Sequence, residues 1–305
     1  MKYVIDTDPG VDDILALTVG IRELDVLLLS VVGGNISLPY ATQNALDYVA
    51  YLGRKTKVCS GSDSSINGTK FISENWLFGE NGIADHKLEK SDLEAEKADV
   101  ADVLFKTIME AEEKVSIIAI APLTNIARLI QAYPSVRENL DEILIMGGST
   151  NGLGNVTETA EYNFYSDPEA VKIVFESGIK IKLFPLDFTR THTLSEEEIN
   201  YLGKNCGDTG KTLYSVISAA TKNFKKMHKQ NQKKSFALHD LFVAMYAVDS
   251  SLFKTKQAEF SVDIEGNRGQ TFCKFDGIKT SHIEVICDVN REKFIKKLFD
   301  IVGNN

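Results

Sequence analysis

The chain has 305 residues, of which 43% are hydrophobic and 25% charged, a composition typical of a folded globular protein rather than a disordered one. Its formal net charge is −9, which argues against a protein that binds nucleic acid or an anionic membrane. The four cysteines form no Cys-x-x-Cys pair, so neither a zinc knuckle nor a thioredoxin-like redox motif is present.

The first predicted elements alternate between strand and helix. A short apolar strand over residues 3–5 ends in a carboxylate-rich turn. The following helix carries Asp12 and Asp13 in its first turn, where acidic side chains favour the helix dipole, and its apolar residues keep helical spacing as far as Leu24. An apolar strand over residues 26–32 comes next, and Pro39 and Gly53 are placed to begin and end a second helix.

The same alternation continues through the middle of the chain. Further strands are predicted over residues 115–121, 142–146 and 179–184. Helices between them begin at Pro122 and at Asp167-Pro168 and end near Ala132 and Gly178. This order favours an α/β fold with an open, mostly parallel, Rossmann-like sheet that helices cover on both faces.

The C-terminal part has a different pattern. Residues 194–249 read mostly as helix, and residues 257–289 contain short alternating strands that could form an antiparallel edge or an appendage on the same core. Residues 60–97 and 150–166 lack a periodic pattern, and long loops in a compact domain are often functional. Because no repeat or linker divides the chain, we expect one domain over residues 1–305.

The N-terminal segment predicts the cellular location. Its carboxylates leave no apolar stretch for a signal peptide, and no run approaches the ~18 uncharged apolar residues of a membrane span. We therefore expect a cytoplasmic protein that contacts neither a membrane nor nucleic acid.

Four carboxylates follow the first predicted strand, at Asp6, Asp8, Asp12 and Asp13. Ligands of open α/β sheets bind at the carboxyl ends of strands, and crowded carboxylates repel each other unless protons or a cation lie between them. A site for a hard cation is one interpretation, and a solvated acidic helix N-terminus is another. A third is a phosphatase, because Asp6-Thr7-Asp8 has the Asp-x-Asp spacing of enzymes with an aspartate nucleophile.

The segment from Asp6 to Asp13, Asp-Thr-Asp-Pro-Gly-Val-Asp-Asp, resembles the signature of the inosine-uridine-preferring nucleoside hydrolases. The resemblance extends over almost the whole chain in an ordered series of motifs. These are Gly33-Gly34-Asn35, Ala121-Pro122-Leu123-Thr124-Asn125, Met146-Gly147-Gly148, Gly154-Asn155-Val156-Thr157, Ala160-Glu161-Tyr162-Asn163, Asp167-Pro168-Glu169-Ala170, Pro185-Leu186-Asp187-Phe188-Thr189 and Leu238-His239-Asp240. Ala121 stands where the family has glycine.

The resemblance implies a bound Ca²⁺ that holds the 2′- and 3′-hydroxyls of a ribose. The implied metal ligands are Asp8, Asp13, Asp240 and the main-chain carbonyl of Ile120. A carbonyl ligand tolerates any side chain, so an isoleucine is acceptable at that position. Asp8 is also the implied general base, which takes a proton from the attacking water.

The remaining implied site residues contact the substrate. The implied partners of the sugar hydroxyls are Asp12, Asn155, Glu161 and Asn163. Asn35 is placed near the water and the base, and His239 is our candidate for protonating the leaving base. Phe78 stands where the family often has histidine; its ring can stack on a base but cannot donate a proton. The segment 223–234 aligns loosely with an aromatic-containing region of the family near the base.

The resemblance therefore predicts a calcium-dependent enzyme that hydrolyses the N-glycosidic bond of ribonucleosides, as a homodimer or homotetramer. Two alternatives stay open at this point: the metal-dependent phosphatase, and a nucleoside-binding protein without catalytic activity. Release of ribose from nucleosides, or of phosphate from esters, distinguishes them.

Overall fold

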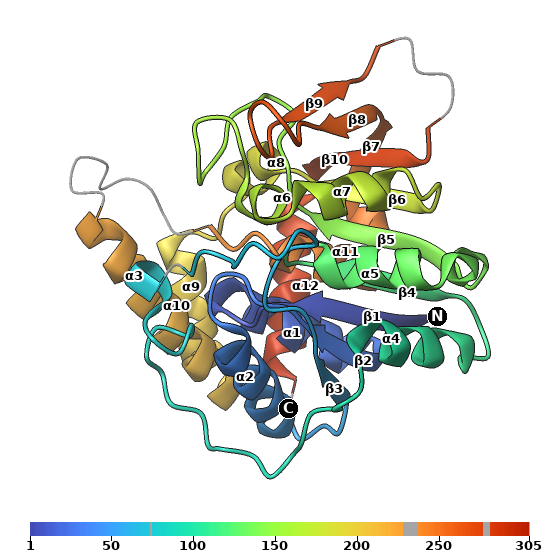
Figure 1. The fold of residues 1–305 in the computed structure, drawn as a ribbon. Helices are drawn as coiled ribbons and strands as arrows, with labels where there is room; N and C mark the ends of the chain where they lie inside the picture. The colour runs from blue at the N-terminus through green and yellow to red at the C-terminus, as the bar shows by residue number, and fades with distance from the viewer. Residues whose placement is uncertain (74, 228–236, 277–280, 305) are drawn as a thin grey trace.

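The computed structural model describes residues 1–73, 75–227, 237–276 and 281–304, and its centre is an eight-stranded sheet (Figure 1). The strand order is β3-β2-β1-β4-β5-β6-β10-β7, and every neighbouring pair is parallel except β10 and β7. The strands are β1 (Lys2–Thr7), β2 (Asp25–Val31), β3 (Lys57–Ser60), β4 (Val115–Ala119), β5 (Leu140–Met146), β6 (Lys180–Phe184), β7 (Phe253–Gln257) and β10 (Ile283–Val289). A separate antiparallel hairpin contains β8 (Glu259–Val262) and β9 (Thr271–Lys274).

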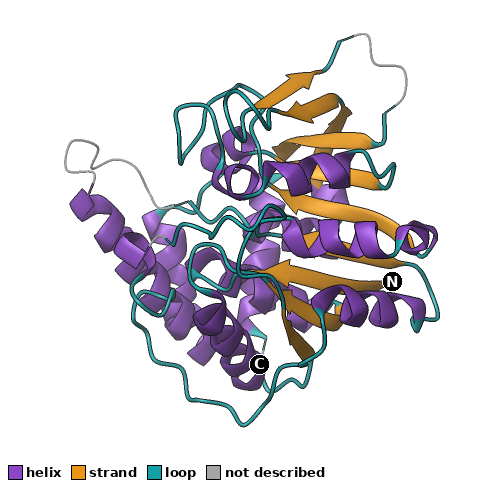
Figure 2. Cartoon of the chain, in the orientation of Figure 1, coloured by secondary structure: helices purple, strands orange, loops and turns teal. Residues whose placement is uncertain are grey.

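Helices cover both faces of the sheet (Figure 2). One buried apolar cluster contains side chains of α1 (Val11–Glu23), α2 (Leu38–Tyr51), α9 (Glu196–Asn205), α10 (Gly207–Met227), α11 (Leu241–Val248) and α12 (Arg291–Gly303). The other contains side chains of α4 (Val100–Met109), α5 (Thr124–Ala132) and α7 (Pro168–Phe175). Strand β1 contributes Tyr3 and Ile5 to the first cluster and Val4 to the second, because successive side chains of a strand point to opposite faces.

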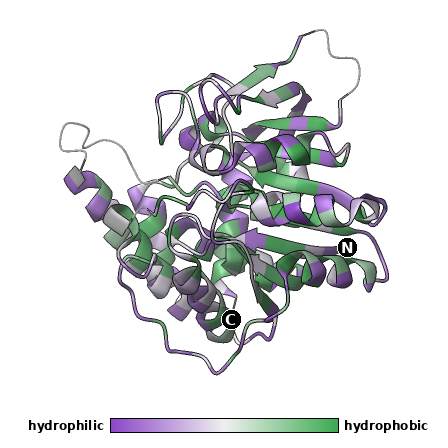
Figure 3. Ribbon diagram, in the orientation of Figure 1, coloured by the Kyte–Doolittle hydropathy of each residue, from purple (hydrophilic) through white to green (hydrophobic). Residues whose placement is uncertain are grey.

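The middle residues of the central strands are apolar, as Figure 3 shows by their green colour, and polar residues lie near several strand ends. A strand that is buried on both faces needs such a continuous run. In the described part of the chain, no helix is both long and apolar enough to cross a membrane.

The predicted fold class is confirmed, since the sheet is mostly parallel and antiparallel pairs occur near the C-terminus. Several elements escaped prediction, among them β3, α4 and α12. The strands expected over residues 257–289 are only partly antiparallel. Strand β10 pairs parallel with β6 in the main sheet and antiparallel with β7. Short edge strands carry too few residues for a clear period.

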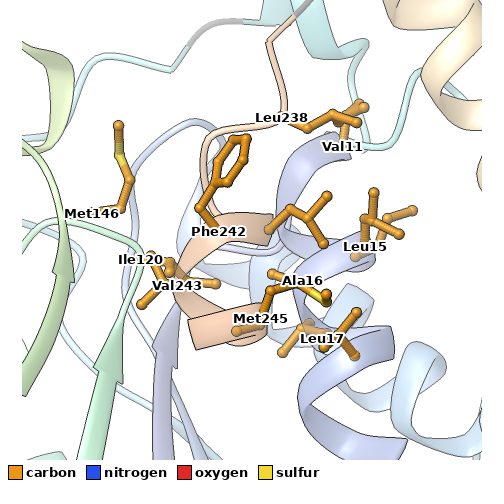
Figure 4. Packing of buried hydrophobic residues seen from close by; sticks show 14 of the residues in the cluster. Val11, Leu15, Ala16, Leu17, Ile120, Met146, Leu238, Phe242, Val243 and Met245 are labelled. Carbon is orange, nitrogen blue, oxygen red and sulfur yellow. The ribbon is translucent and has the colours of Figure 1, made fainter. Parts of the chain in front are cut away.

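Three short helices lie in the connections: α3 (Asn75–Phe78), α6 (Tyr162–Ser166) and α8 (Leu186–Thr191). Two 3₁₀ turns complete the elements, at Pro134–Glu138 and Ser250–Leu252. Helix α11 packs against α1, and Figure 4 shows apolar side chains of both helices filling the space between them. This packing brings the start of α11 to the start of α1, where the acidic turn lies.

Candidate active site

The acidic turn lies at the point where the sheet changes its winding direction. The chain passes from β1 outward to β2 and β3 on one side, and then from β4 to β5 and β6 on the other. Neighbouring strands β1 and β4 therefore diverge into different connections at their carboxyl ends, which is where open α/β sheets bind ligands. The arrowheads of β1 and β5 in Figure 1 point to this edge of the sheet.

Asp13 holds the turn together. Its Oδ1 accepts hydrogen bonds from the Thr7 hydroxyl at 2.6 Å and the Asp8 amide at 3.3 Å. Its Oδ2 accepts a hydrogen bond from the Gly10 amide at 2.9 Å, in the position that stabilises a helix N-terminus. The carboxylate is fully buried, so the backbone of the turn fixes its orientation.

Asp8 and Asp12 each have a buried oxygen with no protein partner. The Asn35 amide donates to Asp8 Oδ2 at 2.6 Å, but neither Asp8 Oδ1 nor Asp12 Oδ1 has a hydrogen-bond partner in the described structure. Buried polar atoms are nearly always satisfied, so these two oxygens point to a ligand that completes the site. Gly34 makes room for Asp8, because a Cβ at this position would overlap Asp8 Oδ2.

The carboxylates form a cluster that suits a cation. Oxygens of Asp12, Asp13 and Asp240 all lie within 4.8 Å of one another, and all three residues are buried. Burial raises the pKa of Asp8 and Asp240 well above the usual value, with repulsion among the neighbouring carboxylates adding to the effect, and it raises the pKa of Asp12 to about 7. A hard divalent cation fits this set of oxygen donors and would relieve the repulsion.

The structure thus brings together the predicted acidic ligands with one difference. The three carboxylates that lie within 4.8 Å of one another include Asp12, which the resemblance assigns to the sugar. They do not include Asp8, which the resemblance assigns to the metal. Asp8 nevertheless interacts electrostatically with Asp13 and Asp12. Ile120 lies just after β4; its amide donates to the carbonyl of Asp6 at 2.9 Å, and its buried side chain belongs to the core (Figure 4). Its role as a carbonyl ligand stays a prediction.

A second polar wall is formed by Glu161 and Asn163 at the start of α6. The Glu161 carboxylate accepts hydrogen bonds from the amides of Gly148, Asn163 and Phe164 at 2.9–3.1 Å. Burial still raises its pKa to about 7. The Asn163 amide group donates to the carbonyl of Met146 at 3.2 Å. Both side chains are buried and held by backbone, so this wall is preorganised.

The two remaining asparagines lie nearer the surface. Asn155 is exposed, and its Oδ1 accepts a hydrogen bond from the Tyr162 amide at 2.8 Å. Asn35 is partly buried, and its backbone amide holds Asp8. Their predicted substrate contacts stay predictions.

His239 precedes Asp240 and is partly buried. Its Nδ1 lies 2.7 Å from the hydroxyl of Thr189 in α8. Burial, with a smaller effect of the Arg190 charge, lowers the pKa of His239 to about 3, so the ring is neutral at physiological pH. Proton donation by His239 would therefore come from a neutral imidazole rather than from an imidazolium.

The predicted base side of the site includes Phe78 and the segment 223–234. Phe78 ends α3 and is only 4% exposed, within the same apolar cluster as α1 and α11. Its predicted stacking on a base stays a prediction. Of the segment 223–234, Phe224 packs against that cluster, whereas residues 228–236 lie outside the described residues.

Sequence reasoning missed a buried asparagine behind the acidic turn. Asn44 of α2 donates from Nδ2 to the carbonyl of Pro9 at 3.0 Å and to the carbonyl of Asn81 at 2.6 Å. It thereby ties the turn to the loop that follows α3. Arg190 was missed as well, and in neither case does a local motif mark the residue.

The predicted phosphatase finds no support in this geometry. Its nucleophile would be Asp6, but this residue is fully buried; its Oδ1 accepts hydrogen bonds from Ser30 at 2.5 Å and Asn125 at 2.9 Å, and its Oδ2 has no partner in the described structure. A buried set of carboxylates and amides at the switch point of a parallel sheet is instead the arrangement of an α/β enzyme with a small polar substrate.

The chain belongs to the inosine-uridine preferring nucleoside hydrolase family, whose model matches residues 3–296. It is therefore a hydrolase that acts on N-glycosyl compounds, and the predicted family and enzyme class are confirmed. Family membership also answers the alternatives of a phosphatase and of a binding protein without activity.

Relatives cover the same length. The chain is 30% identical to the non-specific ribonucleoside hydrolase RihC of Escherichia coli O157:H7, over 99% of this chain and 98% of the relative. Among solved structures, a purine-preferring ribonucleoside hydrolase from Gardnerella vaginalis superposes with a TM-score of 0.91 at 25% identity, covering 99% and 98% of the two chains. A plant nucleoside hydrolase superposes with a TM-score of 0.91 at 27% identity, covering 100% and 99%.

Replacement of Gly34 tests the close approach of the backbone to Asp8. We expect Gly34→Ala to lower kcat/KM for nucleoside hydrolysis at least about tenfold, because the added methyl group displaces Asp8 Oδ2. Gly303→Ala is the control, since its Cβ would lie 3.8 Å from the nearest atom. Equal kcat/KM in both variants would contradict the assignment of Asp8.

The raised carboxylate pKa values predict how the metal-free protein responds to pH. A carboxylate whose pKa is about 3.8 unfolded and about 7 folded stabilises the fold below pH 4, and this contribution is lost as the pH rises through 7. With chelator present, we expect thermal unfolding to show a loss of at least about 2 kcal/mol between about pH 5.5 and about pH 8. Stability that rises over this range would contradict the buried, uncompensated cluster.

Proposed function

We propose that this enzyme hydrolyses the N-glycosidic bond of ribonucleosides to ribose and a free purine or pyrimidine base, with Ca²⁺ as cofactor. The observation that carries the proposal is the buried cluster of carboxylates with two unpartnered oxygens, at Asp8 and Asp12. The relative named a non-specific ribonucleoside hydrolase supports the broad choice of base.

Asp8, Asp13, Asp240 and the carbonyl of Ile120 are the proposed calcium ligands. Calcium prefers carboxylate and carbonyl oxygens, which are the donors that these residues supply. When bound, the cation orients the sugar diol and lowers the pKa of a nearby water. Asp12, close to Asp13 and Asp240, then has its free Oδ1 for a ribose hydroxyl.

Asp8 is the proposed general base. Its Oδ2 is held by the Asn35 amide, which leaves the unpartnered Oδ1 to accept the proton of the attacking water. As the glycosidic bond breaks, positive charge develops on the sugar ring, as in other glycoside hydrolysis. The surrounding carboxylates stabilise this charge more than the neutral substrate, and that difference lowers the barrier.

The sugar and the base are recognised by unequal means. Asp12, Glu161, Asn163 and Asn155 are the proposed partners of ribose hydroxyls, because carboxylates and amides together satisfy both donors and acceptors. The base side has only Asn35, Phe78 and His239 among the proposed residues. A neutral His239 can donate a hydrogen bond to the departing base while Thr189 holds its Nδ1.

We further propose a cytoplasmic homodimer or homotetramer. The assembly is checked by analytical ultracentrifugation, for which two or four copies of the 33.8 kDa chain give distinct masses.

Asp8→Asn keeps the shape of the side chain but removes the carboxylate that is the proposed general base. We expect kcat to fall at least about a hundredfold, the low end of the effect of a lost general base. Ribose release measured by a reducing-sugar assay checks this, with Asp25→Asn as the control, since Asp25 pairs with Lys2 on the surface. Near-normal turnover by Asp8→Asn with its calcium content intact would rule out this role.

Substrate analogues test the sugar site directly. We expect kcat/KM for 2′-deoxyuridine to be roughly 10⁴-fold below that for uridine, because the lost hydroxyl leaves buried polar groups unpaired. Inosine should differ from uridine by less, since aromatic stacking tolerates different rings. Chelation should abolish ribose release and added calcium should restore it; cleavage of deoxyuridine within tenfold of uridine would refute the proposed diol site.

A further inference from the structure

The β8–β9 hairpin stands outside the main sheet but reaches the active-site loops. In Figure 1 it lies at the top of the molecule, beyond β10, near α6 and α8. Gln270, directly before β9, forms an isolated antiparallel bridge with Ala160, the residue before Glu161. A segment from the last part of the chain thus pairs with the segment that begins the sugar wall.

The hydroxyl of Thr271, the first residue of β9, makes two hydrogen bonds to the backbone of Ser149. It donates to the Ser149 carbonyl at 2.7 Å and accepts from the Ser149 amide at 3.0 Å. Thr271 and Ser149 are 4% and 1% exposed, so water cannot replace these bonds. This pair fixes the loop directly after Gly148.

Gly148 connects the loop at Ser149 to Glu161. Its φ of +66° is a left-handed conformation that glycine adopts without strain, and a Cβ there would lie 2.8 Å from the Phe164 ring and 3.2 Å from the Thr271 methyl group. The Gly148 amide donates to Glu161 Oε2 at 3.0 Å. The methyl group of Thr271 thus packs against the residue whose amide holds the Glu161 carboxylate.

The loop between β8 and β9 holds the opposite end of α6. Arg268 donates from Nε to the carbonyl of Tyr165 at 3.2 Å, from Nη2 to the carbonyl of Ser166 at 3.3 Å, and from Nη1 to Glu169 Oε1 at 3.1 Å. Hydrogen bonds within the loop fix its shape, because Asp263 accepts from three backbone amides at 2.8–2.9 Å. The loop can therefore hold Arg268 in place against α6.

We propose that Thr271 is a positioning residue of the sugar site and that the β8–β9 hairpin is a brace for Glu161 and Asn163. The brace holds both ends of the wall: Thr271 fixes the loop that binds Glu161, and Arg268 fixes the end of α6. Neither residue is among the proposed substrate contacts. The proposed effect on catalysis rests on the proposed function, in which this wall binds ribose.

Thr271→Val tests the brace with little change in shape, because it keeps a methyl group against Gly148 and removes only the hydroxyl. We expect amide hydrogen exchange to increase in peptides that contain Ser149 and Glu161. We also expect inhibition by free ribose to weaken, and kcat/KM for uridine to fall, each about tenfold, with inhibition by free uracil unchanged. A merely structural defect would not separate the two products.

Thr255→Val is the matched control, because the Thr255 hydroxyl donates to Glu284 Oε2 at 2.6 Å and so joins β7 to β10 within the main sheet. It should change neither exchange nor ribose inhibition. Arg268→Lys is a second variant in case Thr271→Val fails to fold. It keeps the positive charge but removes the planar guanidinium group that makes the three hydrogen bonds, so amide hydrogen exchange in α6 should increase.

Unchanged exchange and unchanged ribose inhibition in Thr271→Val, or in Arg268→Lys if the first variant does not fold, would overturn the brace. If the wild-type protein releases no ribose, the proposed function is overturned. Increased amide hydrogen exchange in Thr271→Val would still support the brace in that case.

Discussion

The burial of several carboxylates at one point is the constraint on which the rest of the structure depends. Asp8, Asp12, Asp13 and Asp240 are buried and repel each other, so each needs a partner or a proton. Backbone amides and Thr7 satisfy Asp13, and Gly34 admits Asp8 to the Asn35 amide. Among these four carboxylates, Asp8 Oδ1 and Asp12 Oδ1 stay without a hydrogen-bond partner in the described structure. Local turn geometry, the absence of a Cβ and the packing of two helices all serve this arrangement.

Much of the fold was predictable, because the central strands are continuous apolar runs and the helices between them have clear start and stop residues. The acidic turn was also visible as a pattern. Asp240 was not predictable from spacing, since only the packing of α11 on α1 brings it to the turn; the resemblance to a family supplied it. Helix α6 lies in the loop that lacked a pattern, because five residues are too few for an amphipathic period.

The two sides of the site differ in how they are built. On the sugar side, Glu161 and Asn163 contact main-chain groups, and the residues behind them are held by further hydrogen bonds. On the base side, Phe78 ends a four-residue helix and His239 depends on the hydroxyl of Thr189. Sequence patterns could not show this contrast, because it depends on backbone amides, which every residue possesses. In the proposed function, the half that is held by main-chain hydrogen bonds binds ribose, which all ribonucleosides share, and the other half meets the base, which varies.

The packing of α11 on α1 also has a consequence for biosynthesis. The ribosome adds the turn that carries Asp8, Asp12 and Asp13 long before it adds Asp240 and Thr271. In the interval, the nascent protein holds an acidic turn without its fourth carboxylate and without the β8–β9 hairpin. A product that ends before Asp240 therefore retains the acidic turn but cannot assemble the carboxylate cluster.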